Sequence, residues 1–233
     1  MGTTDDPSLP SCAAMPPSPL FDAVLFDLGG VITATPFAQM RAAAIAKGHE
    51  PDALFNLFMG PDGHDTDHPW HRVERGEITM KEMRPLIAAL AVERGIELDP
   101  NRPTMFSAGT KNPLGDLRAE VLELLADLRT AGYKLAMVTN NAIEIRPLWF
   151  PLAPWDDIFD VIIDSSEVKM RKPSPGIFNL TLERLGGILP HRAIFVDDLP
   201  GNVRGAQTVG LIGVHMTDDY HHGIAEIRAL TGV

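Results

Sequence analysis

The sequence predicts an α/β protein, a doubly wound parallel sheet into which a helical cap domain is inserted. Short apolar runs alternate with segments of helical periodicity, and this order of elements produces a parallel sheet. The apolar runs are continuous, as expected for strands that are buried on both faces. Residues 33–113 do not follow this alternation. We therefore expect a Rossmann-like core that carries residues 33–113 as an insertion.

The expected elements follow the alternation to the C-terminus. Residues 116–130 place leucines three and four positions apart, and Gly132 follows where a helix would end. Residues 175–185 begin with a proline and are followed by two glycines, which marks another helix. The remaining expected elements are helices at 201–208 and 224–230 and strands at 23–26, 134–139, 159–163, 193–196 and 211–214.

The insertion has a helical pattern without a strand pattern. Helical patches occur at residues 37–47, 51–59 and 79–94, and a polar tract lies at 60–69. The N-terminal residues are rich in proline, serine and threonine, which favours disorder. The expected domains are therefore a disordered leader at 1–20, an α/β core at 21–32 and 114–233, and a helical cap at 33–113.

Composition excludes several classes of function. The chain has 233 residues, and 20 Lys and Arg against 31 Asp and Glu give a net charge of −11, which disfavours nucleic acid and anionic membranes as partners. A single cysteine, Cys12, excludes an intramolecular disulfide and a cysteine-rich zinc site. The chain has neither a membrane-spanning apolar run nor a secretory signal pattern. We expect a cytoplasmic protein, and no heptad pattern predicts its oligomeric state.

Polar residues follow the expected strands at their carboxyl ends, where ligands bind in open α/β sheets. Carboxylates gathered there suit Mg²⁺, a hydroxyl and an amide can bind phosphate, and a lysine can stabilise the charge of phosphoryl transfer. An aspartate can attack phosphorus to form a covalent intermediate. The residues in these positions are Asp27, Thr139, Asn140, Lys172, Asp197, Asp198 and Asn202.

Each of these features alone has a plain structural explanation. Gly29 and Gly30 can form a tight turn, and Asp197-Asp198 can cap the next helix. Their joint order, at successive strand ends, favours a catalytic site for phosphate chemistry.

The chain resembles the haloacid-dehalogenase-like (HAD) hydrolase superfamily over residues 21–215. The motifs that carry the resemblance are FDLGGVI at 26–32, VTN at 138–140, KP at 172–173 and FVDD at 195–198, with Asn202. The sequence looks most similar to the subfamily that contains the phosphatase domain of soluble epoxide hydrolases.

The resemblance implies a Mg²⁺-dependent phosphatase that cleaves a small phosphorylated molecule. Asp27 would be the nucleophile and a metal ligand, and Lys172 would bind both nucleophile and phosphate. Thr139 and Asn140 would bind phosphate, and the cap would select the substrate. The remaining metal-site residues would be the Gly29 backbone carbonyl and Asp198, supported by Asp197 and Asn202.

One position departs from the family pattern. Gly29 stands where family phosphatases carry an aspartate that acts as general acid and base. General acid–base catalysis is worth about 10²–10⁴-fold, so we expect weakened or specialised turnover. The insertion contains candidate substitutes in its histidines, although His64 and His68 are expected to be exposed loop residues.

Two alternatives remain open at this point. A chain that binds phosphate but turns over poorly would be a phosphometabolite sensor or an interaction domain. A dehalogenase or a phosphonate-cleaving hydrolase would also lack the second aspartate. Dehalogenases, however, lack the acidic pair Asp197-Asp198, and phosphonate cleavage needs a Schiff-base lysine from the cap, for which the candidates are Lys47, Lys81 and Lys111.

Overall fold

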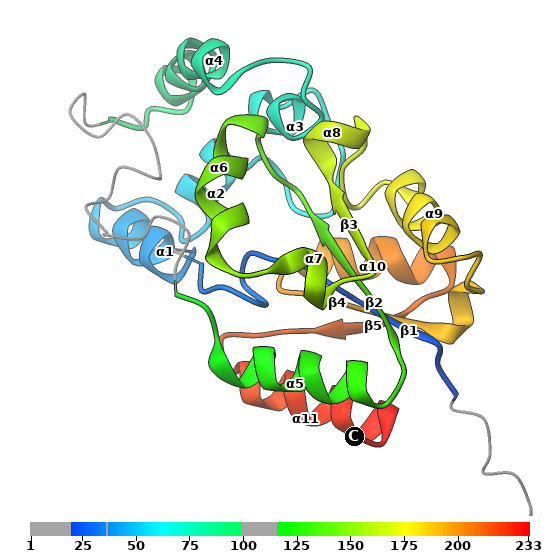
Figure 1. Ribbon diagram of the computed structural model, residues 1–233. Helices are drawn as coiled ribbons and strands as arrows, with labels where there is room; N and C mark the ends of the chain where they lie inside the picture. Colours follow the sequence, from blue (N-terminus) through cyan, green and yellow to red (C-terminus); the bar gives the residue numbers. More distant parts are fainter. Residues whose placement is uncertain (1–19, 36, 99–115) are drawn as a thin grey trace, which may run out of the picture.

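The computed structural model describes residues 20–35, 37–98 and 116–233 (Figure 1). Its centre is a five-stranded sheet in the order β3-β2-β1-β4-β5, and every pairing is parallel. The predicted fold class is confirmed. The strands are β1 (Ala23–Phe26), β2 (Lys134–Thr139), β3 (Val161–Asp164), β4 (Ala193–Asp197) and β5 (Ile212–His215).

Helices cover both faces of the sheet. Side chains of β1 alternate between the faces, so Val24 and Phe26 join one apolar cluster while Ala23 and Leu25 join another. The first cluster includes residues of α5 (Ala119–Thr130) and α11 (Tyr220–Thr231), which lie together on one side (Figure 1). The second includes residues of α9 (Pro175–Arg184) and α10 (Pro200–Val209). The central strand is thus buried on both sides, as the continuous apolar run predicts.

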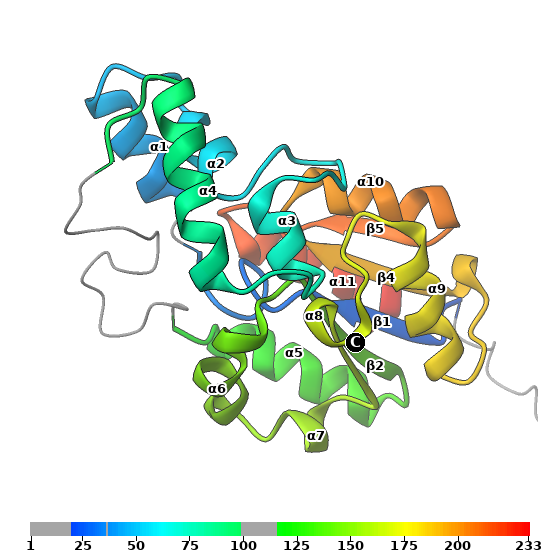
Figure 2. The ribbon, with the colours of Figure 1, turned by 90° about the horizontal axis from the view of Figure 1, so that it is seen from above.

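The described part of the insertion is helical. It forms α1 (Phe37–Ala46), α2 (Ala53–Phe58), α3 (Pro69–Glu74) and α4 (Met80–Glu93), which lie together beyond one edge of the core (Figure 2). Three of them fall within the expected helical patches, whereas α3 begins at the end of the polar tract. Its N-terminus is capped by the His68 side chain, which accepts a hydrogen bond from the Trp70 backbone N–H.

The element bounds differ from the sequence expectation mainly at helix starts. The first core helix begins at Ala119 because Leu117 forms an isolated bridge with Thr33 instead. The leader expected at 1–20, apart from Leu20, and residues 99–113 of the expected cap lie outside the described residues. The short elements not expected from the sequence are α6 (Arg146–Trp149), α7 (Trp155–Ile158), α8 (Ser165–Val168), η2 (Ile143–Ile145), η3 (Phe150–Leu152) and η4 (Pro190–Arg192).

Within these described ranges, none of the helices combines the length and the apolar character needed to cross a bilayer.

Candidate active site

A buried lysine joins two carboxylates at the carboxyl edge of the sheet. The Lys172 Nζ atom lies 2.8 Å from Asp27 Oδ1 and 2.7 Å from Asp197 Oδ2. Burial by itself would lower the pKa of Lys172, but attraction to Asp197 and Asp27 outweighs it, and the pKa is raised. The lysine is therefore a fixed positive charge that holds the ends of β1 and β4 together.

Asp197 is fully buried and has both carboxylate oxygens occupied. Its Oδ1 accepts hydrogen bonds from the Leu199 backbone N–H at 2.9 Å and from Asn202 Nδ2 at 3.0 Å. Its Oδ2 accepts from Lys172. Asp197 and Asn202 thus hold the turn after β4 and orient the lysine.

Asn140 holds the segment that carries Lys172. The Lys172 backbone N–H donates to Asn140 Oδ1 at 2.8 Å, and Asn140 Nδ2 donates to the Lys172 carbonyl at 3.0 Å. The side-chain amide expected to bind phosphate therefore makes two bonds to the protein itself. Thr139 is buried and lines the same cavity as Asp27.

The site carries more negative than positive charge. Carboxylate oxygens of Asp27, Asp197 and Asp198 lie within 4.8 Å of one another, with Lys172 as their cationic partner. Burial, reinforced by Asp197 and opposed by Lys172, raises the pKa of Asp27 to about 7. Burial and the other two carboxylates raise the pKa of Asp198 well above its usual range.

A divalent cation fits this donor set. If all three carboxylates are ionised, one lysine leaves two of their negative charges uncompensated. Burial and this surplus are why the pKa values of Asp27 and Asp198 are raised without a further cation. Oxygen ligands of this kind are those that Mg²⁺ prefers. Asp27 and Asp198 are the carboxylates best placed to ligate it, because the oxygens of Asp197 are occupied by protein donors.

The two positions after Leu28, Gly29 and Gly30, differ in whether a side chain would fit there. Gly30 has a φ of +79°, and a Cβ there would overlap the Asp198 carboxylate. Gly29 has ordinary backbone geometry, and the nearest atom to a Cβ would be Thr35 Cγ2 at 3.9 Å. Glycine is thus needed at position 30 to admit Asp198, whereas position 29 has room for a side chain.

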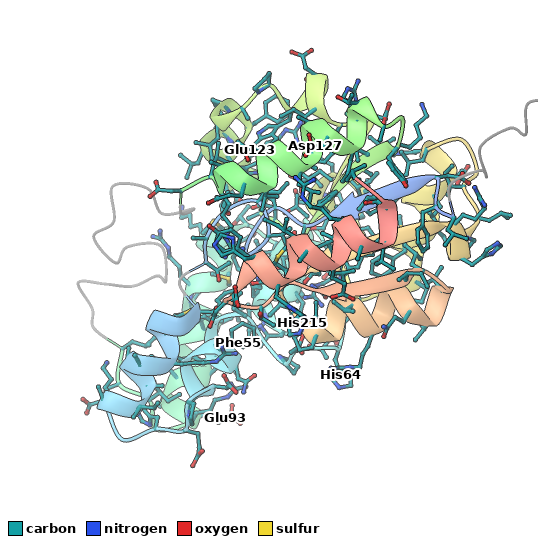
Figure 3. The ribbon with its side chains drawn as sticks, turned by 90° about the horizontal axis from the view of Figure 1, so that it is seen from below. Phe55, His64, Glu93, Glu123, Asp127 and His215 are labelled. Atoms are coloured by element: carbon teal, nitrogen blue, oxygen red, sulfur yellow. The ribbon has the colours of Figure 1, made fainter. Side chains whose placement is uncertain are left out.

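A cavity of about 140 Å³ connects this edge with the cap. Asp27, Gly29 and Asp198 line it on the core side. The cap contributes a wall that is mostly apolar but includes Asp62, and Phe55 of that wall lies on α2 (Figure 3). The apolar lining residues of the cap are Phe37, Phe55, Met59, Pro61 and Trp70.

The same wall contains a buried ion pair that the sequence analysis did not identify. Arg171 Nε lies 2.6 Å from Glu74 Oε2, and Trp70 Nε1 donates to Glu74 Oε1 at 2.7 Å. Burial raises the pKa of Glu74, although Arg171 and Trp70 oppose the shift. The signal available in the sequence is the place of Arg171, directly before the motif lysine.

Among the candidate histidines and lysines of the cap, one lies differently from the expectation. His64 is exposed near α10, as expected (Figure 3). His68, expected to be exposed, is buried because its side chain caps α3, so that prediction is wrong. Lys47 and Lys81 are exposed, and Lys111 lies outside the described residues.

Comparison with curated proteins identifies relatives over most of the chain. Acyl-CoA dehydrogenase family member 10 of Mus musculus is 29% identical over 214 residues, 91% of this chain and 19% of that protein. Bifunctional epoxide hydrolase 2 of Rattus norvegicus is 25% identical over 218 residues, 89% of this chain and 38% of that protein. A sesquiterpene phosphatase of Aspergillus oryzae is 29% identical over 216 residues, 91% of this chain and 97% of that protein. The chain thus spans about a fifth to two fifths of the first two relatives and nearly all of the third.

Solved structures and a family match agree with these relatives. A HAD family enzyme from Bacteroides thetaiotaomicron, in complex with magnesium and inorganic phosphate, superimposes with a TM-score of 0.56 at 24% identity, over 84% of this chain and 93% of that one. A dehalogenase with an intermediate complex has a TM-score of 0.61 at 19% identity, over 93% and 99%. Both likenesses support the fold. Residues 21–210 match the family described as haloacid dehalogenase-like hydrolase, and the chain belongs to this family of hydrolases.

Proposed function

We propose that this hydrolase is a Mg²⁺-dependent phosphatase that cleaves a small-molecule phosphate ester through an aspartyl-phosphate on Asp27. The observation that carries the proposal is the charge arrangement: three carboxylates lie close together, two of them are paired with one buried lysine, and Asp27 and Asp198 line a cavity. Such a site needs an additional cation before an anionic phosphate can approach an anionic nucleophile.

Asp27 and Asp198 would hold the Mg²⁺ with the Gly29 backbone carbonyl, and Asp197 and Asn202 would support them. The bound ion would neutralise the carboxylates and the phosphate oxygens, which lowers the repulsion between nucleophile and substrate. Lys172 would supply the remaining positive charge. Thr139, and the backbone N–H of Asn140, would donate hydrogen bonds to phosphate.

The geometry of Asp27 leaves one oxygen for the attack. Its Oδ1 accepts hydrogen bonds from the Leu28 backbone N–H at 2.7 Å and from Lys172, which fixes the orientation of the carboxylate. Because Asp27 would also hold the Mg²⁺, one of its two oxygens forms the bond to phosphorus while the ester P–O bond breaks and the leaving alkoxide takes a proton. Water then attacks the phosphorus and gives up a proton to solvent, the bond between Asp27 and phosphorus breaks, and phosphate is released with the Asp27 carboxylate restored.

Gly29 determines which esters such a site can cleave. It carries no carboxyl group to protonate the leaving oxygen or to activate water. The proton therefore comes from water or another group, and esters with weakly basic leaving groups are favoured. This absence is also what favours the second candidate function, a phosphometabolite sensor or interaction domain with little turnover.

The nucleophile is tested with a panel of phosphate esters that differ in leaving-group basicity, each assayed with and without Mg²⁺. Asp27→Asn is expected to abolish turnover. Hydrolysis that continues without the metal, or in Asp27→Asn, contradicts the mechanism. Halide release without metal identifies a dehalogenase instead.

The role of Gly29 is tested with two matched variants. Gly29→Asp is expected to raise turnover of esters with strongly basic leaving groups, and Gly29→Ala controls for the added bulk, because both side chains start in the same free space. Tight phosphate binding with no turnover of any ester, even in Gly29→Asp, supports the sensor.

A further inference from the structure

One contact between the cap and the core is made by a turn before α3, which lies against the start of α10 (Figure 2). We refer to residues 60–63 as the cap turn. All four of them line the cavity that contains Asp27. The helix that the cap turn meets begins two residues after Asp198. The contact therefore joins the cap to the chain segment that carries the proposed metal site.

Asp62 of the cap turn supplies a capping group that α10 lacks in its own sequence. The N-cap position of α10 is Leu199, whose side chain forms no capping hydrogen bond. The backbone N–H of Gly201 lies in the first helical turn, where no intrahelical acceptor is available. It donates to Asp62 Oδ2 at 3.1 Å. Because a carboxylate at this end of a helix also interacts favourably with the helix dipole, Asp62 stabilises the first turn of α10.

The backbones of the cap turn and of α10 are in direct contact. A Cβ at Gly201 would overlap the backbone of Gly63 and the carboxylate of Asp62. The φ of Gly201 is not positive, so its backbone does not require glycine. The close approach of the cap turn is therefore what requires glycine at position 201.

The side-chain contacts of Asp62 hold the cap turn only weakly. Arg204 Nη2 lies 3.7 Å from Asp62 Oδ2, but the Arg204 side chain is exposed, and exposed ion pairs contribute little. Asp62 Oδ1 is buried and has no hydrogen-bond partner among the described residues, which costs free energy. One main hydrogen bond is thus opposed by one unpaired oxygen, so a small change in free energy is enough to move the cap turn on or off the helix.

The first turn of α10 also fixes the segment that carries Asp198. Asn202 Nδ2 donates to the two oxygens of Asp197 at 3.0 and 3.2 Å. The Leu199 backbone N–H donates to Asp197 Oδ1 at 2.9 Å. Asp198 lies between Asp197 and Leu199 in the chain. A shift of this helical turn would therefore move the backbone on both sides of a proposed metal ligand.

We propose that Asp62 is a positioning residue, which caps α10 from the cap domain and thereby couples docking of the cap turn to binding of Mg²⁺ at Asp27 and Asp198. Coupling of this kind is reciprocal, so Mg²⁺ strengthens docking by the same factor by which docking strengthens Mg²⁺ binding. The inference rests on the proposed Mg²⁺ site and adds a residue of the cap to those that govern its affinity.

Calorimetric titration with Mg²⁺ tests the coupling on the full chain without substrate. Asp62→Ala is expected to weaken Mg²⁺ binding by up to about 5-fold, the contribution of one N-cap hydrogen bond. Asp62→Asn keeps an acceptor for the Gly201 N–H and should recover most of the affinity. Asp67→Ala is the matched control, because Asp67 belongs to the same cap segment, is fully exposed and does not line the cavity. It should bind Mg²⁺ as the wild type does.

A second variant separates docking of the cap turn from the stability of α10. Gly201→Ala suits a helix, yet its methyl group would overlap the cap turn. It should weaken Mg²⁺ binding as well. The double variant with Asp62→Ala should bind Mg²⁺ no more weakly than Gly201→Ala alone, because both substitutions break the same contact. Losses that multiply in the double variant would overturn the inference, since Gly201→Ala would then act through the helix alone.

Amide hydrogen exchange gives a readout that is independent of activity. The Gly201 N–H should exchange slowly in the wild type and in Asp62→Asn, and faster in Asp62→Ala. Mg²⁺ should further slow exchange of the cap turn in the wild type, but not in Asp62→Ala. The cap turn contains no ligand of the proposed metal site, so this response would depend on its contact with α10. Exchange of the cap turn that does not respond to Mg²⁺ in the wild type overturns the inference.

Failure of this inference and failure of the proposed function give different results. Equal Mg²⁺ affinity in the wild type and in Asp62→Ala overturns the inference, while Mg²⁺-dependent hydrolysis of a phosphate ester still supports the phosphatase. If the wild type does not bind Mg²⁺, the proposed function and this inference both fail.

Discussion

Arg171 and Lys172 are neighbours in the chain, yet they serve two different electrostatic environments. Lys172 enters the sheet edge, where three carboxylates outnumber it. Arg171 enters the cap wall, where Glu74 balances it. The sheet edge therefore retains negative charge for a metal to compensate, whereas the positive charge of Arg171 is compensated within the wall. The difference shows that two adjacent cationic residues can be fixed in place for different reasons, one in a site with surplus carboxylates and one in a compensated ion pair.

Removing the lysine should cause the largest loss. Lys172→Met leaves Asp27 and Asp197 buried without their cation, and breaking a buried pair in this way costs about 3–5 kcal/mol of unfolding free energy. Activity should fall by about 10³-fold, because a preorganised charge at the reacting phosphate is lost. Denaturant unfolding and a phosphatase assay measure the two effects.

A second substitution tests whether the charge of Lys172 or the packing of its side chain stabilises this edge. In Lys172→Met combined with Asp197→Asn, part of the stability should return because one unpaired charge is removed, while activity stays low. A double variant as unstable as Lys172→Met alone would mean that packing of the lysine stem, and not its charge, stabilises the edge.

The two environments also differ in how far the sequence predicts them. The bounds of β1 and β2 match the continuous apolar runs, because burial on both faces imposes that pattern. The topology then brings the residues at the strand ends to one edge, so Asp27, Lys172 and Asp197 meet as expected, while their catalytic roles stay predictions.

The cap wall could not be predicted in this way. Glu74 and Arg171 are 97 residues apart, and the burial of each charged side chain depends on the other as its partner. His68 is likewise buried through a local cap on α3, in a tract whose composition is typical of an exposed loop. Burial of polar residues depends on tertiary partners, and no local pattern encodes them.

Removing the negative charge of Glu74 from the cap wall should change the preference among substrates. Glu74→Gln leaves Arg171 with a partly uncompensated charge beside the cavity, so substrates with a second carboxylate should gain about 10-fold in kcat/KM relative to neutral ones. Loss of the buried pair should also cost about 3 kcal/mol of unfolding free energy. The control is Glu77→Gln, whose carboxylate pairs with Arg75 and does not line the cavity. An unchanged preference in Glu74→Gln would contradict the view that the wall is neutral because of this pair.

The two glycines after Asp27 should respond unequally to the same added methyl group. Gly30→Ala forces a side chain into a left-handed backbone and against the Asp198 carboxylate, which should cost about 1–2 kcal/mol from the backbone alone and weaken Mg²⁺ binding. Gly29→Ala has free space and should change stability by less than about 0.5 kcal/mol. Calorimetric Mg²⁺ titration and denaturant unfolding test both, and equal effects at the two positions would show that Asp198 is not held against Gly30.

A last expected effect concerns the pH dependence of stability at the wall, to which His71 of α3 belongs. The pKa of His71 is lowered to about 3 by burial, whereas in the unfolded chain the ring takes up a proton near pH 6.5. Unfolding therefore binds a proton below about pH 6.5, and stability falls as the pH drops from there toward 3. Between pH 7 and 5, the wild type should lose about 2 kcal/mol more unfolding free energy than His71→Gln. Unfolding curves of the wild type and of His71→Gln at the two pH values measure this difference.

The stability of the variant still falls with pH, because the pKa of His68 is also lowered by burial, to about 4. If His71→Gln also loses as much stability as the wild type, the ring is protonated in the folded protein and the cap wall is not the neutral surface that distinguishes it from the sheet edge.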